Sequence, residues 1–332
     1  MKPDSEAARR PSLIDVATAA GVSRSAASRA LLGQVGVTTA VRDAVAKAAA
    51  DLGYVKDIRA HALKATSTST IGIVVRTVRL DFYAELIAAM QDRLEALGYS
   101  TALTAASDGD HHATGAFGRI LGLRPDAIIV ASGRIPSRSI EAVGAQVPVT
   151  AIGPTSTSKL VGSVADDGSG TDALAQLITD AGHRKIGVVM YSRARSTTLS
   201  RRSRLLWEAL ERRGLEPFPV KASSRADGVD PEGLRESLNR ITALMCPNDP
   251  TLIAAWNLLD SWGVQVPDDL ALTGYDGLGQ VATPVFGLTT WRQDVAAMAE
   301  AATRQTLDRI AAPNTKPQHV LVQGSLLRGR TV

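Results

Sequence analysis

The residues of this chain best suited to a specific chemistry lie between positions 23 and 29. If this segment is helical, Arg24, Ser25, Ser28 and Arg29 share one face, because residues three and four apart are neighbours on a helix. Arginine can donate two hydrogen bonds to guanine in the major groove, and serine hydroxyls suit phosphates or mixed base contacts. The pattern predicts a surface that reads double-stranded nucleic acid.

Short helices around this segment would hold that face outward. Ser12 and Asp15 form a capping box that begins a first helix. Its apolar residues follow at helical spacing, at Ile14, Ala17 and Ala20. Gly21 tolerates the left-handed backbone of a sharp turn, and Ser23 caps a second helix through Leu32.

A third helix is capped by Thr38, repeats apolar residues as far as Leu52 and ends at Gly53. Three short helices with a tight turn between the first two predict a helix-turn-helix bundle. The alternative is a bundle that binds another protein. A face of arginine and serine around so small a core favours the nucleic acid-binding interpretation.

The net charge of +4 is carried by the first fifth of the chain. Residues 1–70 contain ten Lys and Arg against six Asp and Glu, whereas the remaining 27 and 27 cancel. A basic head on a neutral body favours a polyanion-binding module joined to a second domain. A solvated basic tail is the alternative that charge alone leaves open.

From residue 71 onwards, apolar strands alternate with helices. We expect strands at Ile71–Val75, Thr101–Thr104, Ala127–Val130, Val149–Ile152, Ile186–Met190, Ala243–Cys246 and Leu270–Gly274. We expect the main helices at Phe82–Leu97, Gly170–Ala181, Arg201–Arg213, Pro250–Trp262 and Asp294–Ala311. This alternation predicts two doubly wound parallel sheets, with a ligand cleft between them at the carboxyl ends of the strands.

Enzyme chemistry is not indicated. The chain has no glycine-rich nucleotide motif after a strand, no Walker loop and no nucleophile elbow. His111 and His112 fall in a polar segment, residues 108–113, which we interpret as a solvated loop and not as a metal site. Cys246, the single cysteine, lies on an apolar strand and is interpreted as a core residue and not as a nucleophile. We expect no cofactor.

Two further classes are disfavoured. No run of about 18 apolar residues occurs, so we expect no membrane span. The segment Met1–Ser12 has no apolar stretch typical of a secretory signal, which together with the single cysteine predicts a cytoplasmic protein. A solute-binding protein for a transporter would suit the body pattern, but it would require such a signal and no basic head.

Short motifs occur along the chain in a characteristic order. In the head they are Asp15-Val16-Ala17, Ala20-Gly21-Val22-Ser23 and Ser28-Arg29-Ala30-Leu31. In the body they are Phe82-Tyr83-Ala84-Glu85-Leu86, Gly182–Ile186, Asn248-Asp249, Val266–Asp269, Gly274–Asp276 and Leu288–Thr290. Together these motifs resemble the lactose/galactose repressor (LacI/GalR) family of bacterial regulators over nearly the whole chain.

The resemblance implies an N-terminal all-α helix-turn-helix head, residues 1–56, and a hinge helix with a linker, residues 57–70. The remainder, residues 71–332, would be an α/β body like periplasmic binding proteins, with two doubly wound parallel-sheet lobes. We expect the lobes to comprise residues 71–164 with 294–319, and 165–291 with 320–332. A homodimer would bind a palindromic operator in double-stranded DNA as a repressor, with a small-molecule effector, such as a sugar, between the lobes.

Residue by residue, the resemblance places two sets at DNA-contacting positions: the base readers Arg24, Ser25 and Arg29, and the phosphate contacts Ser23 and Ser28. The segment 57–64 matches a hinge helix that orders on DNA, in which Ala60 and Leu63 match residues packed into the minor groove. Leu63 would part a central base step and kink the duplex. The alternative for Leu63 is burial against its own head.

Five residues match ligand-contacting positions of the family: Phe82, Tyr83, Arg202, Asn248 and Asp276. The polar members would bind hydroxyls, or an anion through Arg202, and the aromatic rings would stack on an apolar ligand face. The alternatives are helix packing for the aromatic pair and strand-end capping for Asn248 and Asp276. Gly153 departs from the family, some members of which carry a ligand-binding aspartate there, so the effector need not be a sugar.

Overall fold

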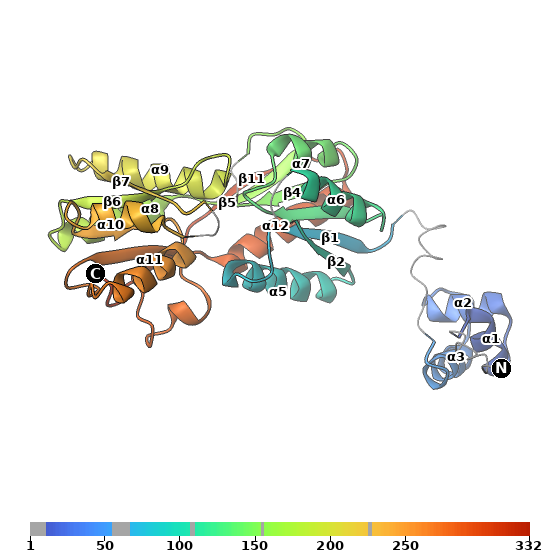
Figure 1. The fold of residues 1–332 in the computed structure, drawn as a ribbon. Coiled ribbons are helices and arrows are strands. Elements are labelled where there is room, and N and C mark those ends of the chain that lie inside the picture. The colour runs from blue at the N-terminus through green and yellow to red at the C-terminus, as the bar shows by residue number, and fades with distance from the viewer. Residues whose placement is uncertain (1–10, 55–66, 107–109, 154–155, 225–227) are drawn as a thin grey trace, which may run out of the picture. The chain divides into compact units, whose positions relative to one another are not determined.

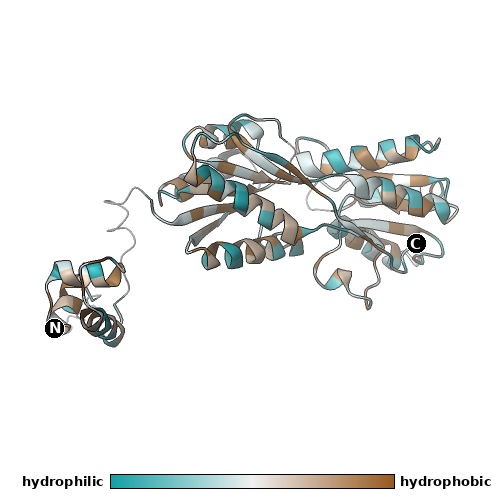
Figure 2. Cartoon of the chain, turned by 180° about the vertical axis from the view of Figure 1, so that it is seen from behind, coloured by the Kyte–Doolittle hydropathy of each residue, from teal (hydrophilic) through white to brown (hydrophobic). Residues whose placement is uncertain are grey.

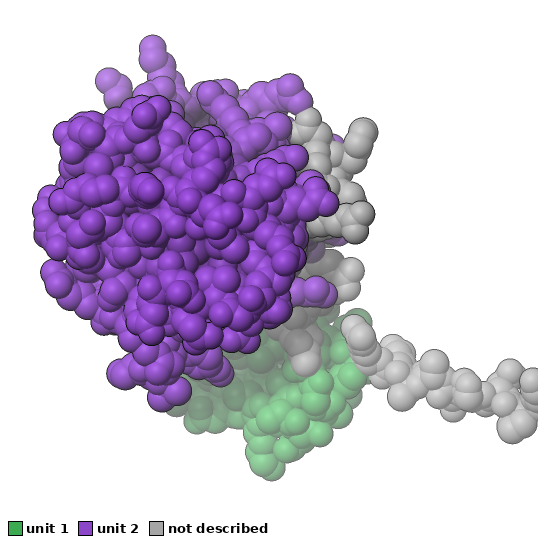
Figure 3. Space-filling view, turned by 60° about the vertical axis from the view of Figure 1, so that its left-hand side comes forward, with its two compact units in different colours: residues 1–68 green, residues 69–332 purple. Residues whose placement is uncertain are grey.

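The computed structural model describes residues 11–54, 67–106, 110–153, 156–224 and 228–332. The chain divides into two compact units, which we call the head, residues 1–68, and the body, residues 69–332 (Figure 3). The predicted hinge helix, including Ala60 and Leu63, lies outside the described residues.

The head contains three helices: α1 (Leu13–Ala19), α2 (Arg24–Leu31) and α3 (Thr39–Asp51). All three predicted caps are confirmed, because each N-cap hydroxyl accepts a hydrogen bond from the backbone three residues on. At α1 the capping box is complete, since Asp15 Oδ2 accepts from the Ser12 backbone at 2.7 Å. Gly21 has a φ of +65°, which gives the sharp turn between α1 and α2 its left-handed backbone.

The core of the head consists mainly of alanine and valine: Val16, Ala17, Ala27, Ala30, Val45, Ala48 and Ala49. Of the apolar residues at helical spacing in α1, Ile14 is 58% exposed and lies outside this core, whereas Val16 is fully buried. The buried face of α1 centres on Val16 and Ala17, and Ile14 lies two residues, about 200°, from Val16 around the helix. Small side chains at this contact allow the three helices to approach closely.

The first lobe of the body, which we call the N-lobe, contains a six-stranded parallel sheet in the order β11-β5-β4-β3-β1-β2 (Figure 1). Its strands are β1 (Thr70–Val75), β2 (Ser100–Ala105), β3 (Ala127–Ala131), β4 (Val149–Ile152), β5 (Val161–Asp166) and β11 (His319–Val322). One face packs on α5 (Asp81–Ala96) and α12 (Val295–Ala311), the other on α6 (Asp110–Leu121) and α7 (Ser137–Gly144). Both faces are buried, which explains the continuous apolar strands.

The second lobe, the C-lobe, contains a six-stranded sheet in the order β12-β10-β9-β8-β6-β7, in which only β12 is antiparallel to its neighbour. Its strands are β6 (Ile186–Met190), β7 (Phe218–Lys221), β8 (Ala243–Met245), β9 (Ala271–Asp276), β10 (Thr290–Arg292) and β12 (Ser325–Leu327). Its helices are α8 (Ser169–Asp180), α9 (Thr197–Glu211), α10 (Pro231–Ser237) and α11 (Asp249–Ser261), with a 3₁₀ turn η1 (Gly279–Ala282). Figure 2 shows that the helices covering the sheets are amphipathic, with hydrophilic and hydrophobic residues on different sides. The predicted fold class is confirmed.

The chain passes between the two sheets three times: after β5, after β10 and after β11. Because Val322 pairs with Asp166, both strands belong to the N-lobe to their last residues. The first and third passages therefore fall two or three residues later than the expected boundaries at 164 and 319.

The expected polar loop over residues 108–113 is wrong in its second half, because the backbone of α6 is helical from Asp110 and includes His111 and His112. Among the described residues, no helix is both long and apolar enough to cross a membrane.

Candidate functional site

One candidate surface lies on α2 of the head. Arg24, Ser25 and Arg29 are exposed and Ser28 is half-buried, while Ala27 and Ala30 on the opposite side are buried against the other helices. Burial of the alanine side therefore presents the predicted base-reading residues to solvent.

Ser23 belongs to the same surface and also holds the helix start. Its side-chain oxygen accepts from the Ala26 backbone at 3.1 Å. A hydroxyl that accepts with one lone pair keeps its proton for donation, so the cap is compatible with a bond to a phosphate oxygen. The first turn of α2 also directs its free backbone N–H groups outward, as suits an anion.

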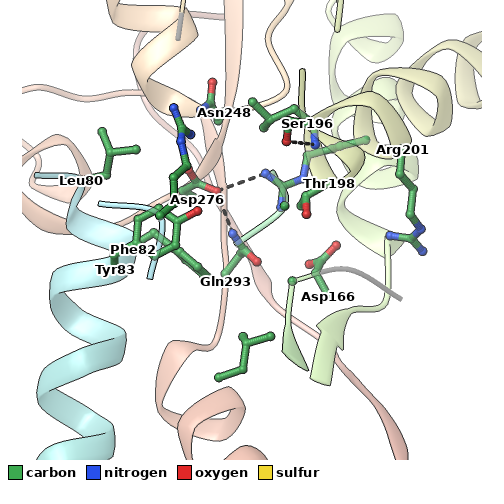
Figure 4. A pocket seen from close by; sticks show the side chains of 16 residues that line it. Leu80, Phe82, Tyr83, Asp166, Ser196, Thr198, Arg201, Asn248, Asp276 and Gln293 are labelled. Atoms are coloured by element: carbon green, nitrogen blue, oxygen red, sulfur yellow. Dashed lines mark hydrogen bonds and ion pairs between the residues drawn. The ribbon is translucent and has the colours of Figure 1, made fainter. Parts of the chain in front are cut away.

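A pocket lies in the body between the two lobes (Figure 4). It is lined by the start of α5, by the carboxyl ends of β4, β5 and β9, and by the start of α9. The space between its lining atoms, counted with its open mouth, is about 700 Å³. All five predicted ligand-contacting residues line it: Phe82, Tyr83, Arg202, Asn248 and Asp276. The structure thus brings these residues together at the edge where doubly wound sheets bind ligands.

An ion pair occupies the C-lobe side of this pocket. Arg202 Nη1 lies 3.1 Å from Asp276 Oδ1 and donates to the Pro247 carbonyl at 2.8 Å. The guanidinium carbon lies 3.8 Å from the centre of the Tyr275 ring, a cation–π contact. Gln293 Nε2 donates to the same Asp276 oxygen at 2.7 Å. Asp276 has a φ of +128°, a strained conformation that such a network has to hold in place.

The other three predicted residues, Phe82, Tyr83 and Asn248, also have the structural roles that were their alternatives, namely helix packing and capping. Phe82 and Tyr83 pack edge to face, with ring centres 5.2 Å apart, and contribute to the N-lobe core. Asn248 caps α11, since its side-chain oxygen accepts from the Thr251 backbone at 3.1 Å and from the Thr251 hydroxyl. These residues therefore have a packing or capping role and also line the pocket.

Sequence reasoning missed six polar residues of the lining: Arg76, Asp166, Ser196, Thr198, Arg201 and Gln293. Asp166 is 6% exposed and accepts from the Tyr275 hydroxyl at 2.6 Å. Asp166 ends β5 and Gln293 follows β10, so the rule that polar residues at strand carboxyl ends face a ligand would have found both. Neither strand was predicted.

Burial opposes both charges of the ion pair, with different outcomes. For Arg202 the charge of Asp276 outweighs burial and holds the pKa of the guanidinium above its ordinary value. For Asp276 burial wins: it raises the pKa to about 7 against the attraction of Arg202, and Asp249 adds repulsion. The contact is therefore an ion pair above about pH 7, and a hydrogen bond to a protonated Asp276 below it.

This shift makes the stability of the body depend on pH. The pKa of Asp276 rises from 3.8 to about 7 on folding, so the folded state binds a proton that the unfolded chain releases. The stabilisation is complete below about pH 4 and is lost as pH rises through about 7. We expect the difference in unfolding free energy between wild type and Asp276→Asn to change between pH 5 and pH 8, with wild type losing more. Denaturant unfolding at both pH values measures it, with the exposed Asp308→Asn as control; parallel profiles for wild type and Asp276→Asn would contradict the assignment.

Cys246 is fully buried, and burial raises the pKa of its thiol, as expected for a core residue and not for a nucleophile. In the described part of the chain, no group of three or more His, Cys, Asp or Glu could hold a metal ion.

Comparison with known proteins gives matches in both units. Residues 12–57 match the family model of bacterial regulatory proteins of the lacI family, and residues 175–332 match that of the periplasmic binding protein-like domain. The chain is 27% identical to the HTH-type transcriptional repressor PurR of Haemophilus influenzae (strain PittEE), covering 89% of this chain and 90% of that protein. It is 26% identical to the PurR protein of Mannheimia succiniciproducens, covering 96% and 97%.

Solved structures agree with the fold. The lac repressor dimer bound to operator and the anti-inducer ONPF has a TM-score of 0.82 at 22% identity, covering 97% of this chain and 99% of that one. The complex of the transcriptional regulator CelR with cellobiose has a TM-score of 0.68 at 25% identity, covering 97% and 100%.

Proposed function

We propose that this chain, whose residues 12–57 match the lacI family model, is a transcriptional repressor that binds operator DNA through α2. Its operator affinity is modulated by a small molecule bound in the pocket between the lobes. It acts by binding and not by catalysis, in the cytoplasm, and the effector is a small organic molecule held by the residues that line this pocket.

The observation that carries this proposal is the face of α2 that holds the exposed Arg24, Ser25 and Arg29 and the half-buried Ser28, on a helix whose other side is buried. Arginine and serine on an N-capped helix meet the requirements of base reading and phosphate anchoring. One head can contact only a few base pairs, so specificity requires two heads in a homodimer on an inverted repeat. The Ala60 and Leu63 minor-groove contacts remain part of this proposal.

Selection from random double-stranded oligonucleotides at low ionic strength tests the proposal. We expect enrichment of an inverted repeat whose half-sites are centred about 10 base pairs, or a multiple of that, apart. Because phosphate contacts release counterions, affinity should fall steeply as salt rises. Single-stranded oligonucleotides of the same sequence serve as control. Enrichment of no sequence, or footprinting that protects one asymmetric half-site only, would contradict it.

A further inference from the structure

The loop between α2 and α3 displays an apolar side chain that the fold of the head does not use. Val35 is 92% exposed, more than any other large apolar side chain of the described residues. It lies outside the described core of the head, against which the nearby Val37 packs. Surface turns favour glycine, asparagine, aspartate and serine, whereas a β-branched residue is typical of strands. The valine at this position therefore requires a reason other than the folding of the head.

Val35 is held in place by the residues on both sides of it. The Gln34 backbone N–H donates to the Arg29 carbonyl at 3.0 Å, and the Gln34 carbonyl accepts from Arg42 Nη2 at 3.3 Å. On the other side, Gly36 has a φ of +92°, and an added Cβ there would lie 3.7 Å from Arg29 Nη1. Both neighbours of Val35 thus lie against Arg29, so the valine adjoins the face of α2 that we propose to read bases.

The charges beside Val35 indicate which kind of partner covers it. Arg29 and Arg42 give the loop a positive surrounding, which suits the phosphates of DNA better than the apolar face of a second protein. In the major groove the apolar group on the base edges is the C5 methyl of thymine. Contact between this methyl and a valine removes apolar surface of both from water, and it distinguishes thymine from cytosine, which lacks the methyl.

We infer that Val35 is a specificity-determining residue of the head, whose side chain packs on a thymine methyl group in each operator half-site. The inference rests on the proposed function and deepens it, because it assigns one base of the half-site to the loop and not to α2. The hydrogen bonds of Gln34 to Arg29 and Arg42 hold the loop before DNA is bound, so the contact requires little further ordering.

Replacement of thymine by deoxyuridine tests the contact, because it removes the methyl group and keeps the hydrogen-bonding groups of the base. The operator obtained by selection with the full-length protein is synthesised with deoxyuridine at one thymine position at a time, in both half-sites. We expect one position at which the change weakens binding about 4-fold per half-site, or about 15-fold for the duplex, as for one buried methyl group. Gel shifts measure the affinity. The inference is overturned by half-sites without thymine, or by an operator in which deoxyuridine has no effect at any position.

Two variants of the loop show whether the methyl effect belongs to Val35. Val35→Ala shortens the side chain, so the same deoxyuridine substitution should weaken binding less than about 2-fold. Val35→Ile keeps a branched apolar side chain and should retain the full effect. Because Val35 is 92% exposed, neither change should alter the melting temperature of the protein. A methyl effect of equal size in Val35→Ala and wild type would assign the contact to another residue and refute the inference.

Leu321→Ala is the control for truncation of an exposed apolar side chain. Leu321 is 58% exposed on β11 of the body, so this variant should keep the operator affinity and the methyl effect of wild type. A loss of the methyl effect in both variants would count against a contact made by Val35. The outcomes also separate the two proposals. An operator that is enriched but whose methyl groups do not couple to Val35 overturns this inference alone, whereas enrichment of no sequence removes both.

Discussion

Replacing Arg29 with alanine should abolish the preference of the protein for its operator over random DNA while the body remains folded. Arg29 is exposed on the last turn of α2, and the buried Ala30 beside it fixes the side of the helix from which Arg29 projects. A bidentate arginine–guanine pair discriminates by about 1–3 kcal/mol, so a dimer with two heads should lose roughly 2–6 kcal/mol of specificity.

Competition gel shifts with operator and scrambled duplexes measure this ratio. Arg29→Lys is the matched control, because it keeps the positive charge but loses the planar fork that donates two parallel bonds. It should retain affinity for random DNA and lose most of the discrimination. A specificity ratio in Arg29→Ala equal to that of wild type would remove Arg29 from the base-reading set.

Replacing Arg202 with alanine should destabilise the body by about 3–5 kcal/mol, the usual cost of breaking a buried ion pair from one side. The change leaves Asp276 without its counter-ion, removes the donor to the Pro247 carbonyl and uncovers the Tyr275 ring. Asp249, buried beneath the pocket, adds to the penalty because its charge already raises the pKa of Asp276. Denaturant unfolding of the full-length protein measures the loss.

Arg212→Ala is the control for this effect. Arg212 Nη2 lies 2.9 Å from Asp172 Oδ1, a shorter contact than that between Arg202 and Asp276, but both side chains are about half exposed. Water screens such a pair, and its removal should cost at most about 1 kcal/mol. Similar losses in the two variants would show that burial does not set the strength of the Arg202 interaction.

The elements predicted correctly from the sequence are those marked by a local signal, such as a capping residue or a run of apolar residues. Capping hydroxyls at Ser12, Ser23 and Thr38 marked the three head helices, and long apolar runs marked β1 and β3. By contrast, β5 was missed because Gly162 and Ser163 interrupt its apolar run. An added Cβ at position 162 would meet the end of the Gln305 side chain of α12, which would then have to move. That contact lies far away in sequence and cannot be read locally.

The residues that line the pocket were likewise predicted only in part. Phe82, Tyr83, Arg202, Asn248 and Asp276 were found through short family motifs, and the structure places all of them on one cavity. Asp166, Thr198 and Gln293 belong to no such motif. What distinguishes them is their hydrogen bonding in the folded protein. Gln293 donates to Asp276, 17 positions away, and Asp166 accepts from Tyr275, 109 positions away, so neither contact can be read from neighbouring residues.

The three crossings of the chain between the two sheets have a consequence for co-translational folding. The N-lobe sheet is closed at one edge by β11, and one of its faces is covered by α12, yet both emerge only after the strands of the C-lobe from β6 to β10. Until then the apolar side chains of Ile71, Ile73 and Val75 lack part of their cover. The nascent N-lobe therefore keeps apolar surface exposed to chaperones while the C-lobe is synthesised. We expect the body to complete folding only when the chain is close to release from the ribosome.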